Sequence, residues 1–477
     1  MHLLGLGHLK RDVLNREVML MAAEAASKRT SGRLDGQSRR LIAVHGMYAA
    51  ASALSGTFIP VYLWKAKESF ESIGWFCISQ YIVSGLLFWI AGKWVKEHNK
   101  MIVFRLGIVL SGCFYFTVLM LGPSAHRWVV PIGILDGLAL GLFWLSYNII
   151  YFEVTERDNR DRYNGLVGLI GSAAGIVAPW LSGLIITSSR DEIGYRIIFT
   201  ASLVVLAGAV IGSLGLKNRG PEGHYDWMLP LRQLKERGNP WRRFALAITT
   251  QGIRDSVFMF LVGLTVYMAT HNEQKLGNYA LITSSVSLVS FWLVGRRMRM
   301  NHRSRAMLVG VVALSAVITP LFLGISYPLL LVFGIGTAML TPLYMIPMTS
   351  SVFDLIGQSE QSVKQREEFI VLRELALTFG RAIGMTAYLL VLTQTHSPAA
   401  ITWLLFGVGS MPIVGWIAIR HLLNRTAAED NGFHTAQRKE DAYATHRTID
   451  NGPHWRHTSD SVKKAGNRAG RRGAGEA

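Results

Sequence analysis

Long apolar stretches separated by short polar connections recur along most of the chain. A helix needs about 20 apolar residues to cross the hydrocarbon core of a bilayer, and by that criterion the pattern predicts about twelve transmembrane helices. They lie near residues 41–64, 73–91, 101–121, 128–152, 166–186, 197–216, 244–268, 276–294, 307–325, 329–353, 370–392 and 401–422. The eleventh is the least regular, because charged residues interrupt it. The fold class expected is therefore an all-α membrane protein.

Basic residues in the loops predict how these helices sit in the membrane. Lys and Arg gather in alternate loops, and such loops stay in the cytoplasm. Both termini are basic and fall on that same side, as an even number of crossings requires. The organisation expected is a cytoplasmic tail, a six-helix bundle, a central cytoplasmic loop with a short amphipathic helix near 229–235, a second six-helix bundle and a disordered basic tail. Their bounds are 1–38, 39–216, 217–243, 244–424 and 425–477.

Composition supports the membrane assignment and excludes other classes. Half of the residues are hydrophobic and only 17% are charged, against roughly 25% in soluble domains. The net charge of +18 lies beside apolar spans, so cytoplasmic loops explain it better than nucleic-acid binding. Cys77 and Cys113 both fall in apolar spans, which leaves no disulfide framework. The sequence has no P-loop, no metal-ligand spacing and no nucleophile elbow, so we expect no enzyme, no metal and no cofactor.

An internal repeat relates the two halves of the chain. The segment 88–96, FWIAGKWVK, recurs at 291–299 as FWLVGRRMR, an offset of about 203 residues. Other matched pairs in that register are Gly74 with Gly277, Lys100 with Arg303, and Gly107 with Gly310. Further along the chain, Glu153 matches Asp354 at an offset that is about two residues shorter. Matches of Trp, Gly and basic residues in one register are harder to obtain by chance than matches of Leu and Val.

Both repeats must lie the same way up in the membrane, because both place basic residues on the same side. At this point the chain resembles the major facilitator superfamily, over residues 39–423. The resemblance implies two pseudo-symmetric six-helix bundles around a central cavity that opens alternately to each side. Gly92 and Gly295 fit the family's motif after the second helix. The acidic position of that motif is instead Lys96 in one half and Arg299 in the other, with Glu97 one place late, so the motif does not assign the family's gate-latching carboxylate to a residue of this chain.

The fifth predicted helix carries small residues and a proline at spacings of four. Gly171, Gly175, Pro179 and Gly183 loosely resemble the motif of the family's exporters, which weakly favours export. Two interpretations are open. These residues either let helices pack closely or form a bending point where the halves rock against each other.

Polar and ionisable residues at membrane depth are the sharper indications of a site. Each charged group costs about 2.5–3.5 kcal/mol at a helix centre on insertion scales, so something must offset it. The candidates for substrate binding or proton coupling are Asp136, Asn148, Arg254, Asp255, Glu374 and Arg381. The alternative is structural ion pairing, of Asp255 with Arg381 or of Asp136 with Arg105 or Arg254. Arg254 and Asp255 are neighbours about 100° apart on a helix, so we expect only one of them to face the cavity.

A cytoplasmic gate is expected where charged residues cluster at helix ends. Glu153 and Asp354 end equivalent helices, and basic residues follow each of them, which suggests an ion-pair latch between the halves. The gate candidates are Glu153, Arg157, Asp354, Arg366 and Arg373. The alternative is ordinary interfacial charge of little energetic weight.

These observations predict a secondary active transporter in the inner (cytoplasmic) cell membrane. It would move a small organic solute by alternating access, coupled to protons, with export slightly favoured. Its partners would be the solute, protons and the lipid bilayer, with no nucleic acid. The alternative is a membrane protein that kept this fold but acts as a sensor, lipid-handling protein or assembly partner.

Overall fold

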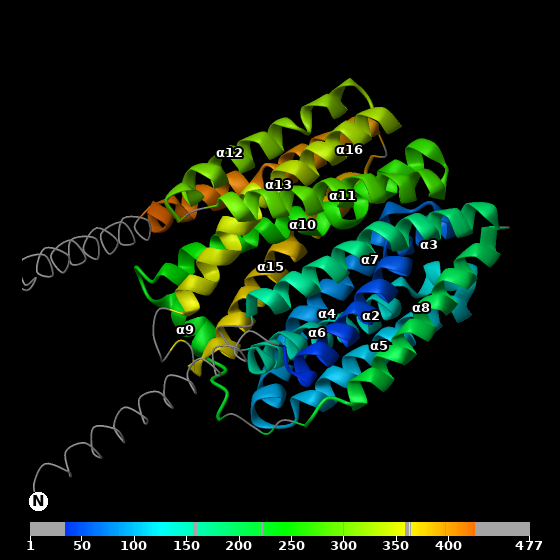
Figure 1. Cartoon of the computed structure of the whole chain (residues 1–477). Helices are drawn as coiled ribbons and strands as arrows, with labels where there is room; N and C mark the ends of the chain where they lie inside the picture. The colour runs from blue at the N-terminus through cyan, green and yellow to red at the C-terminus, as the bar shows by residue number, and fades with distance from the viewer. Residues whose placement is uncertain are drawn as a thin grey trace, which may run out of the picture. The chain divides into compact units, whose positions relative to one another are not determined.

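The computed structural model describes residues 34–424, apart from 156–159, 190, 219, 221–222, 299, 358–361, 363 and 396. Helices dominate this part of the chain (Figure 1). The first half holds α2 (Gly36–Gly56), α3 (Ile59–Lys67), α4 (Phe70–Glu97), α5 (Lys100–Leu121), η1 (Gly122–Trp128), α6 (Val129–Val154), α7 (Arg160–Ser188) and α8 (Asp191–Leu214). After α9 (Leu229–Lys235), the second half holds α10 (Pro240–Thr270), α11 (Glu273–Arg297), η2 (Met300–His302), α12 (Arg303–Ala316), η3 (Thr319–Leu323), α13 (Tyr327–Ile356), α15 (Arg366–Leu392) and α16 (Pro398–Gly409), with residues 411–424 again helical.

Each predicted span has its helix. Eleven stretches of the described residues are long and apolar enough to cross a membrane, and one of them, Lys100–Tyr151, has 52 residues. A single helix of that length would be about 78 Å long, far beyond the roughly 30 Å hydrocarbon core. The stretch instead holds α5 and α6, joined through η1, and supplies two crossings. The predicted all-α membrane fold with about twelve spans is confirmed. The predicted disordered tail, 425–477, lies outside the described residues.

The two halves repeat each other in their turns as well as in their helices. Glu68 and His271, about 203 residues apart, end the first membrane span of each half (at the ends of α3 and α10) in the left-handed region, with φ of 50° and 47°. Ser69 and Asn272 follow them, and each caps the next helix by accepting a backbone N–H three residues on. The same local chemistry therefore makes the same turn twice.

Packing inside the halves follows the repeat too. Lys100 pairs with Glu153 between α5 and α6, and Arg303 pairs with Asp354 between α12 and α13 at 2.5 Å. These are the partners that the sequence repeat matches. Gly107 and Gly310 bring the same two helix pairs into close backbone contact. The pseudo-symmetry of the two bundles thus rests on equivalent contacts.

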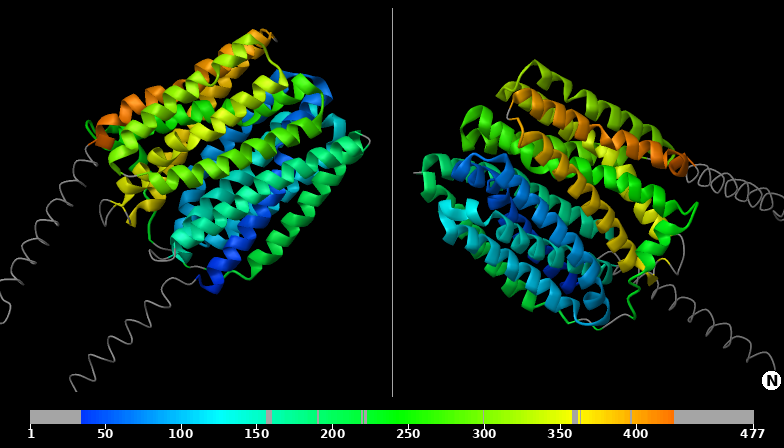
Figure 2. Two further views of the ribbon diagram at one scale, coloured as in Figure 1. Left: turned by 45° about the horizontal axis from the view of Figure 1, so that its top comes forward. Right: turned by 180° about the vertical axis from the view of Figure 1, so that it is seen from behind.

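Two crossed helix pairs join the halves, α4 with α15 and α7 with α11. In both views of Figure 2 the helices of the first half, coloured from blue to green, lie together beside those of the second half, coloured from green to orange. Gly74 on α4 packs against Tyr388 and Leu389 on α15. Its repeat partner, Gly277 on α11, packs against the Pro179 carbonyl on α7. Each half therefore contributes an equivalent helix to the interface, and the central cavity lies between these crossings.

Candidate functional site

Three adjoining chambers occupy the space between the halves. We name them by their charged residues: the Asp136 chamber (≈ 470 Å³), the Arg254 chamber (≈ 400 Å³) and the Arg381 chamber (≈ 400 Å³). Met259 of α10 lines all three, and Gln80, Tyr81 and Leu140 line both the Asp136 and the Arg381 chambers. Together they form one central cavity, within the usual size range of small-molecule sites.

Close packing of α4 on α6 builds the Asp136 chamber. Gly133, Gly137 and Gly141, spaced by four, turn one face of α6 toward α4, and a Cβ at Gly137 would lie 2.5 Å from the Gln80 carbonyl. This approach brings the Gln80 side-chain amide to Asp136, to which it donates a 2.5 Å hydrogen bond. Gln80 is the polar partner of Asp136 among the described residues, and Asp136 has no ion pair there.

The Arg381 chamber collects residues from four helices. Arg381 and Glu374 come from α15, Asn148 from α6 and Tyr81 from α4. Glu374 pairs with Arg373 at 3.1 Å. The Arg381 guanidinium lies over the Tyr81 ring, 5.4 Å from its centroid, an attractive cation–π geometry. Three of the substrate-site candidates, Asn148 of α6 with Glu374 and Arg381 of α15, therefore meet in one chamber.

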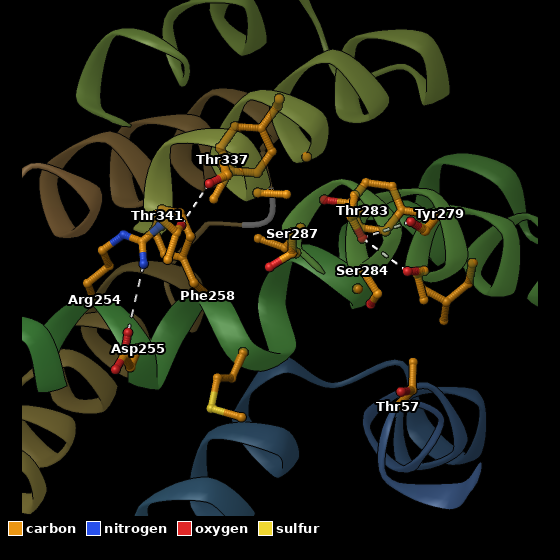
Figure 3. Close-up of a pocket in the computed structure, with 18 residues that line it drawn as sticks. Thr57, Arg254, Asp255, Phe258, Tyr279, Thr283, Ser284, Ser287, Thr337 and Thr341 are labelled. Carbon is orange, nitrogen blue, oxygen red and sulfur yellow. Dashed lines mark hydrogen bonds and ion pairs between the residues drawn. The ribbon is translucent and has the colours of Figure 1, made fainter. Parts of the chain in front are cut away.

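The Arg254 chamber lies mainly within the second half, with Thr57 facing it from the first (Figure 3). Arg254 and Asp255 both line it, 3.8 Å apart, and the Arg254 guanidinium also lies 4.5 Å from the Phe258 ring centroid. The expectation that only one of these neighbours faces the cavity is wrong, because both side chains line this chamber. Its wall is rich in hydroxyl groups, from Thr57, Tyr279, Thr283, Ser284, Ser287, Thr337 and Thr341.

The alternative ion pairs expected from the sequence are not formed within the described part of the chain. Asp255 pairs with Arg254 rather than with Arg381. Arg105 does not reach Asp136, because its guanidinium donates to the carbonyls of Ser213 and Leu216 at the end of α8. Asp136 and Arg381 are thus left in the cavity without an oppositely charged partner among the described residues.

One end of the bundles, which holds the basic loops and is called the basic end below, is closed by a buried ion pair between the halves. Lys96 of α4 lies 2.7 Å from Glu368 and 3.7 Å from Glu367 on α15, and all three side chains are almost fully buried. Lys96 occupies the position where the family motif has its carboxylate. An ion pair between the halves thus forms at this position, with the basic side chain on α4 and the carboxylates on α15.

A segment of the central loop reinforces this closure. Residues 224–228, called the clasp below, run across the ends of α4 and α15. The Tyr225 N–H donates to Glu97 at 3.0 Å and the Asp226 N–H to Glu368 at 3.2 Å, while Trp227 packs edge-on against Trp89. Burial, aided by the Glu368 carboxylate, raises the pKa of the Tyr225 phenol well above its ordinary value. That hydroxyl therefore stays uncharged.

The predicted gate residues lie close to this end but pair differently. Glu153 and Asp354 pair with Lys100 and Arg303 inside their own halves. Arg366 pairs with Glu367, next to the Lys96 contact, and Arg373 pairs with Glu374. Arg157 lies outside the described residues. Lys96, Glu367 and Glu368, which sequence reasoning did not select, make the ion pairs between halves at this end.

The opposite end is closed as well. Lys65 of α3 pairs with Glu273 of α11 at 3.0 Å, and Tyr195 of α8 donates to the same carboxylate at 3.3 Å. The Tyr388 hydroxyl of α15 donates to the Phe70 carbonyl of α4 at 2.9 Å. The central cavity is therefore bounded by polar contacts between the halves at both ends.

The four predicted bending residues of α7 divide into two pairs. Near the closed opposite end, Gly183 and Pro179 pack against α11, where a Cβ at Gly183 would lie 2.7 Å from the Glu273 carbonyl. Toward the basic end, a Cβ at Gly171 or Gly175 would meet open space. The helix runs on through Pro179. Close packing thus explains Gly183 but not Gly171 and Gly175 in this conformation.

Comparisons with known proteins agree with this architecture. A model of the Major Facilitator Superfamily matches residues 41–384. Uncharacterized protein YqgE of Bacillus subtilis (strain 168) is 33% identical over 351 residues, which cover 74% of this chain and 81% of that protein. A Geobacillus stearothermophilus protein, named as uncharacterized in the sodM 3′ region, is 35% identical over 161 residues, 34% of this chain and 75% of its own length.

Solved structures share the fold at low sequence identity. The nucleoside transporter NupG has a TM-score of 0.59 at 14% identity, covering 82% of this chain and 99% of its own. The human organic anion transporter MFSD10 has 0.59 at 13%, covering 81% and 100%. A bacterial homologue of the iron transporter ferroportin, in the outward-facing state with soaked iron, has 0.56 at 14%, covering 80% and 98%. The chain is a multi-pass membrane protein that functions in membrane transport, and it belongs to the major facilitator superfamily.

Proposed function

We propose that this protein is a secondary active transporter that moves a small organic solute by alternating access, coupled to protons at Asp136. The observation that carries the proposal is the Asp136 carboxyl group, which faces the central cavity beside the Gln80 amide and has no ion pair among the described residues. A charged group kept at membrane depth without a partner is costly and marks a functional site.

The chemistry of the Gln80–Asp136 pair suits a proton that comes and goes. The Gln80 amide donates an N–H to a charged carboxylate, and on turning over its carbonyl can accept the O–H of a protonated one. Both states of Asp136 can therefore keep a hydrogen bond. Asp136 would take up a proton from one side of the membrane. It would release that proton to the other side once the first gate has closed and the second has opened.

The two closed ends supply the gates that alternating access requires. The Lys96–Glu368 contact and the clasp bound the cavity at the basic end, and the Lys65–Glu273 contact bounds it at the other. Alternate breaking of these contacts would expose the cavity to one side at a time. We assign the basic end to the cytoplasm, from the positive-inside rule, and the protein to the inner cell membrane. Export is the direction that the glycines and proline of α7 favour.

The test is proton movement in vesicles. The purified protein would be reconstituted with a pH-sensitive dye inside, and pools of candidate solutes would be added outside. We expect a solute-dependent pH change in the wild type that Asp136→Asn abolishes.

The matched control is Glu236→Gln, a carboxyl group beyond α9 that accepts a hydrogen bond from Asn239 outside the cavity. It should leave the pH change intact. If no pool moves protons in the wild type, proton coupling is wrong. If labelled solutes also fail to cross, the transport proposal itself fails.

A further inference from the structure

Not every charged side chain of the cavity has a neighbour of opposite charge. Glu374 is held by Arg373 and Asp255 by Arg254. Arg381 has neither an ion pair nor a hydrogen bond among the described residues, and its Nε is buried without a partner. Its cation–π contact with Tyr81 uses none of the guanidinium N–H groups as hydrogen-bond donors to an oxygen. One positive charge is therefore left over in the Arg381 chamber.

A guanidinium that has no ion pair and no hydrogen bond is suited to an anionic partner. Arginine presents five N–H donors in a planar fork that matches a carboxylate or phosphate with two parallel hydrogen bonds. Stacking on Tyr81 from α4 holds the fork in place before a ligand arrives, which lowers the ordering cost of binding. A buried donor without a partner is expensive, so a site that contains one favours a ligand that satisfies it.

The rest of the chamber fits the remainder of such a molecule. Trp144, Phe88, Leu140 and Leu377 give it apolar and aromatic walls. Uncharged polar groups are added by the amides of Asn148 and Gln80 and the hydroxyl of Ser84. Its volume of ≈ 400 Å³ lies in the range of sites for small organic molecules. An inorganic ion would leave most of these walls uncovered.

We propose that the Arg381 chamber binds the anionic group of a small organic acid, a carboxylate or phosphate monoester with an aromatic or apolar body. This inference rests on the proposed transport function and adds the chemical class of its solute. Asp136, across Gln80 and Tyr81 in the neighbouring chamber, would carry the proton while Arg381 holds the anion. The loaded cavity would then keep its charge near balance.

Binding of matched small probes to the purified protein in lipid nanodiscs tests the proposal by calorimetry. Benzoate, naphthoate and phenyl phosphate are the anions, benzamide is the neutral analogue and benzylamine the cationic one. We expect at least one anion to bind about tenfold or more tightly than benzamide, in line with charge-assisted bidentate bonding. Arg381→Gln should remove that preference, and Arg381→Lys should keep part of it. The anion that binds best separates carboxylate from phosphate recognition.

Arg296→Gln is the matched control, because Arg296 also lies over an aromatic ring, that of Trp292, but lines none of the three chambers. It should leave anion binding unchanged. The proposal is overturned if none of the three anions binds better than benzamide, if benzylamine binds best, or if the preference survives in Arg381→Gln.

Thermal stability gives a second readout that does not depend on the choice of probe. Among the described residues the Arg381 guanidinium has no ion pair or hydrogen bond to lose, only its contact with the Tyr81 ring, so Arg381→Gln should leave the melting temperature of the ligand-free protein nearly unchanged or raise it. A clear fall would show a structural arginine and contradict the proposal. Arg381-dependent anion binding without proton movement would support this inference and contradict the transport proposal. Proton-coupled movement of neutral solutes alone would support the transport proposal and contradict this inference.

Discussion

Single residues decide the chemistry of this cavity through contacts that cross between helices. Asp136 and Arg381, the two charged residues lining the cavity that have no ionic partner among the described residues, stand on either side of Gln80 and Tyr81 on α4. Gln80 donates to one, and the Tyr81 ring lies under the other. These two neutral side chains therefore position both charged groups, and they hold them apart so that the charges do not neutralise each other.

Gln80→Leu tests this role. The substitution keeps the bulk but leaves Asp136 without its hydrogen bond, and we expect a loss of about 1–3 kcal/mol in the free energy of unfolding. The solute-dependent pH change should fall with it. Unfolding in detergent and the vesicle assay measure the two effects.

Gln233→Leu on α9 is the comparison, because that amide oxygen accepts a bond from Asn239 away from the cavity. It should cost less than about 1 kcal/mol. Equal losses in the two variants would show that the Gln80 contact to Asp136 has no special weight.

The proposed gates lie where helices of the two halves meet, and the charged residues that close them come from distant parts of the sequence. Lys96 and Glu368 are 272 residues apart, yet their side chains meet where α4 crosses α15. Burial makes such a pair sensitive to the loss of either partner, since the remaining charge is then left without compensation. The contact requires opposite charges on the two helices, and Glu368 in addition accepts the Asp226 N–H of the clasp.

Charge exchange tests the gate at this level. Lys96→Glu should destabilise the protein by about 3–5 kcal/mol, because it places three carboxylates together in a buried site. Adding Glu368→Lys should recover a large part of that loss and of the transport rate. Unfolding and vesicle flux would be measured on both variants.

Lys93→Met gives the exposed counterpart, because Lys93 and Glu97 form a solvent-facing pair at 3.8 Å. We expect its effect to stay below about 1 kcal/mol. A double variant no better than Lys96→Glu alone would contradict the assigned ion pair.

Sequence reasoning predicted the helices better than the contacts between them. Apolar length located each span, and even the short helix at 229–235 was predicted with its observed bounds, because helix length and polarity are local properties. Gln80 was missed, since an amide at membrane depth is not unusual by itself. The glycines on both sides of Asp136 at spacings of four were the available signal for a close neighbouring helix. The Lys96–Glu368 pair needed the tertiary structure.

Polar contacts join the two halves at both ends of the cavity, so a working cycle requires these contacts to break at each end in turn. At the end away from the basic loops, the Gln274 N–H of α11 donates to the Thr187 hydroxyl of α7 at 3.1 Å. Inside the first half, the hydroxyls of Ser55 and Ser202 lie 2.7 Å apart. The first contact joins the halves and the second does not.

Paired cysteines at these positions distinguish motion between the halves from motion within one. In a background without Cys77 and Cys113, a Thr187→Cys, Gln274→Cys disulfide should block transport, and its reduction should restore it. The Ser55→Cys, Ser202→Cys disulfide should leave transport unchanged. Transport that continues with the first disulfide intact would show that this end does not open.

The clasp also changes how the chain may be divided. Because residues 224–228 bond to α4 and α15 together, the linker is a component of the assembled interface rather than a passive tether. A nick at Gly238, beyond α9, would leave the clasp on the amino-terminal fragment, ready to recruit the other fragment through Glu368. The two fragments, made as separate polypeptides, should then assemble with each other through this contact.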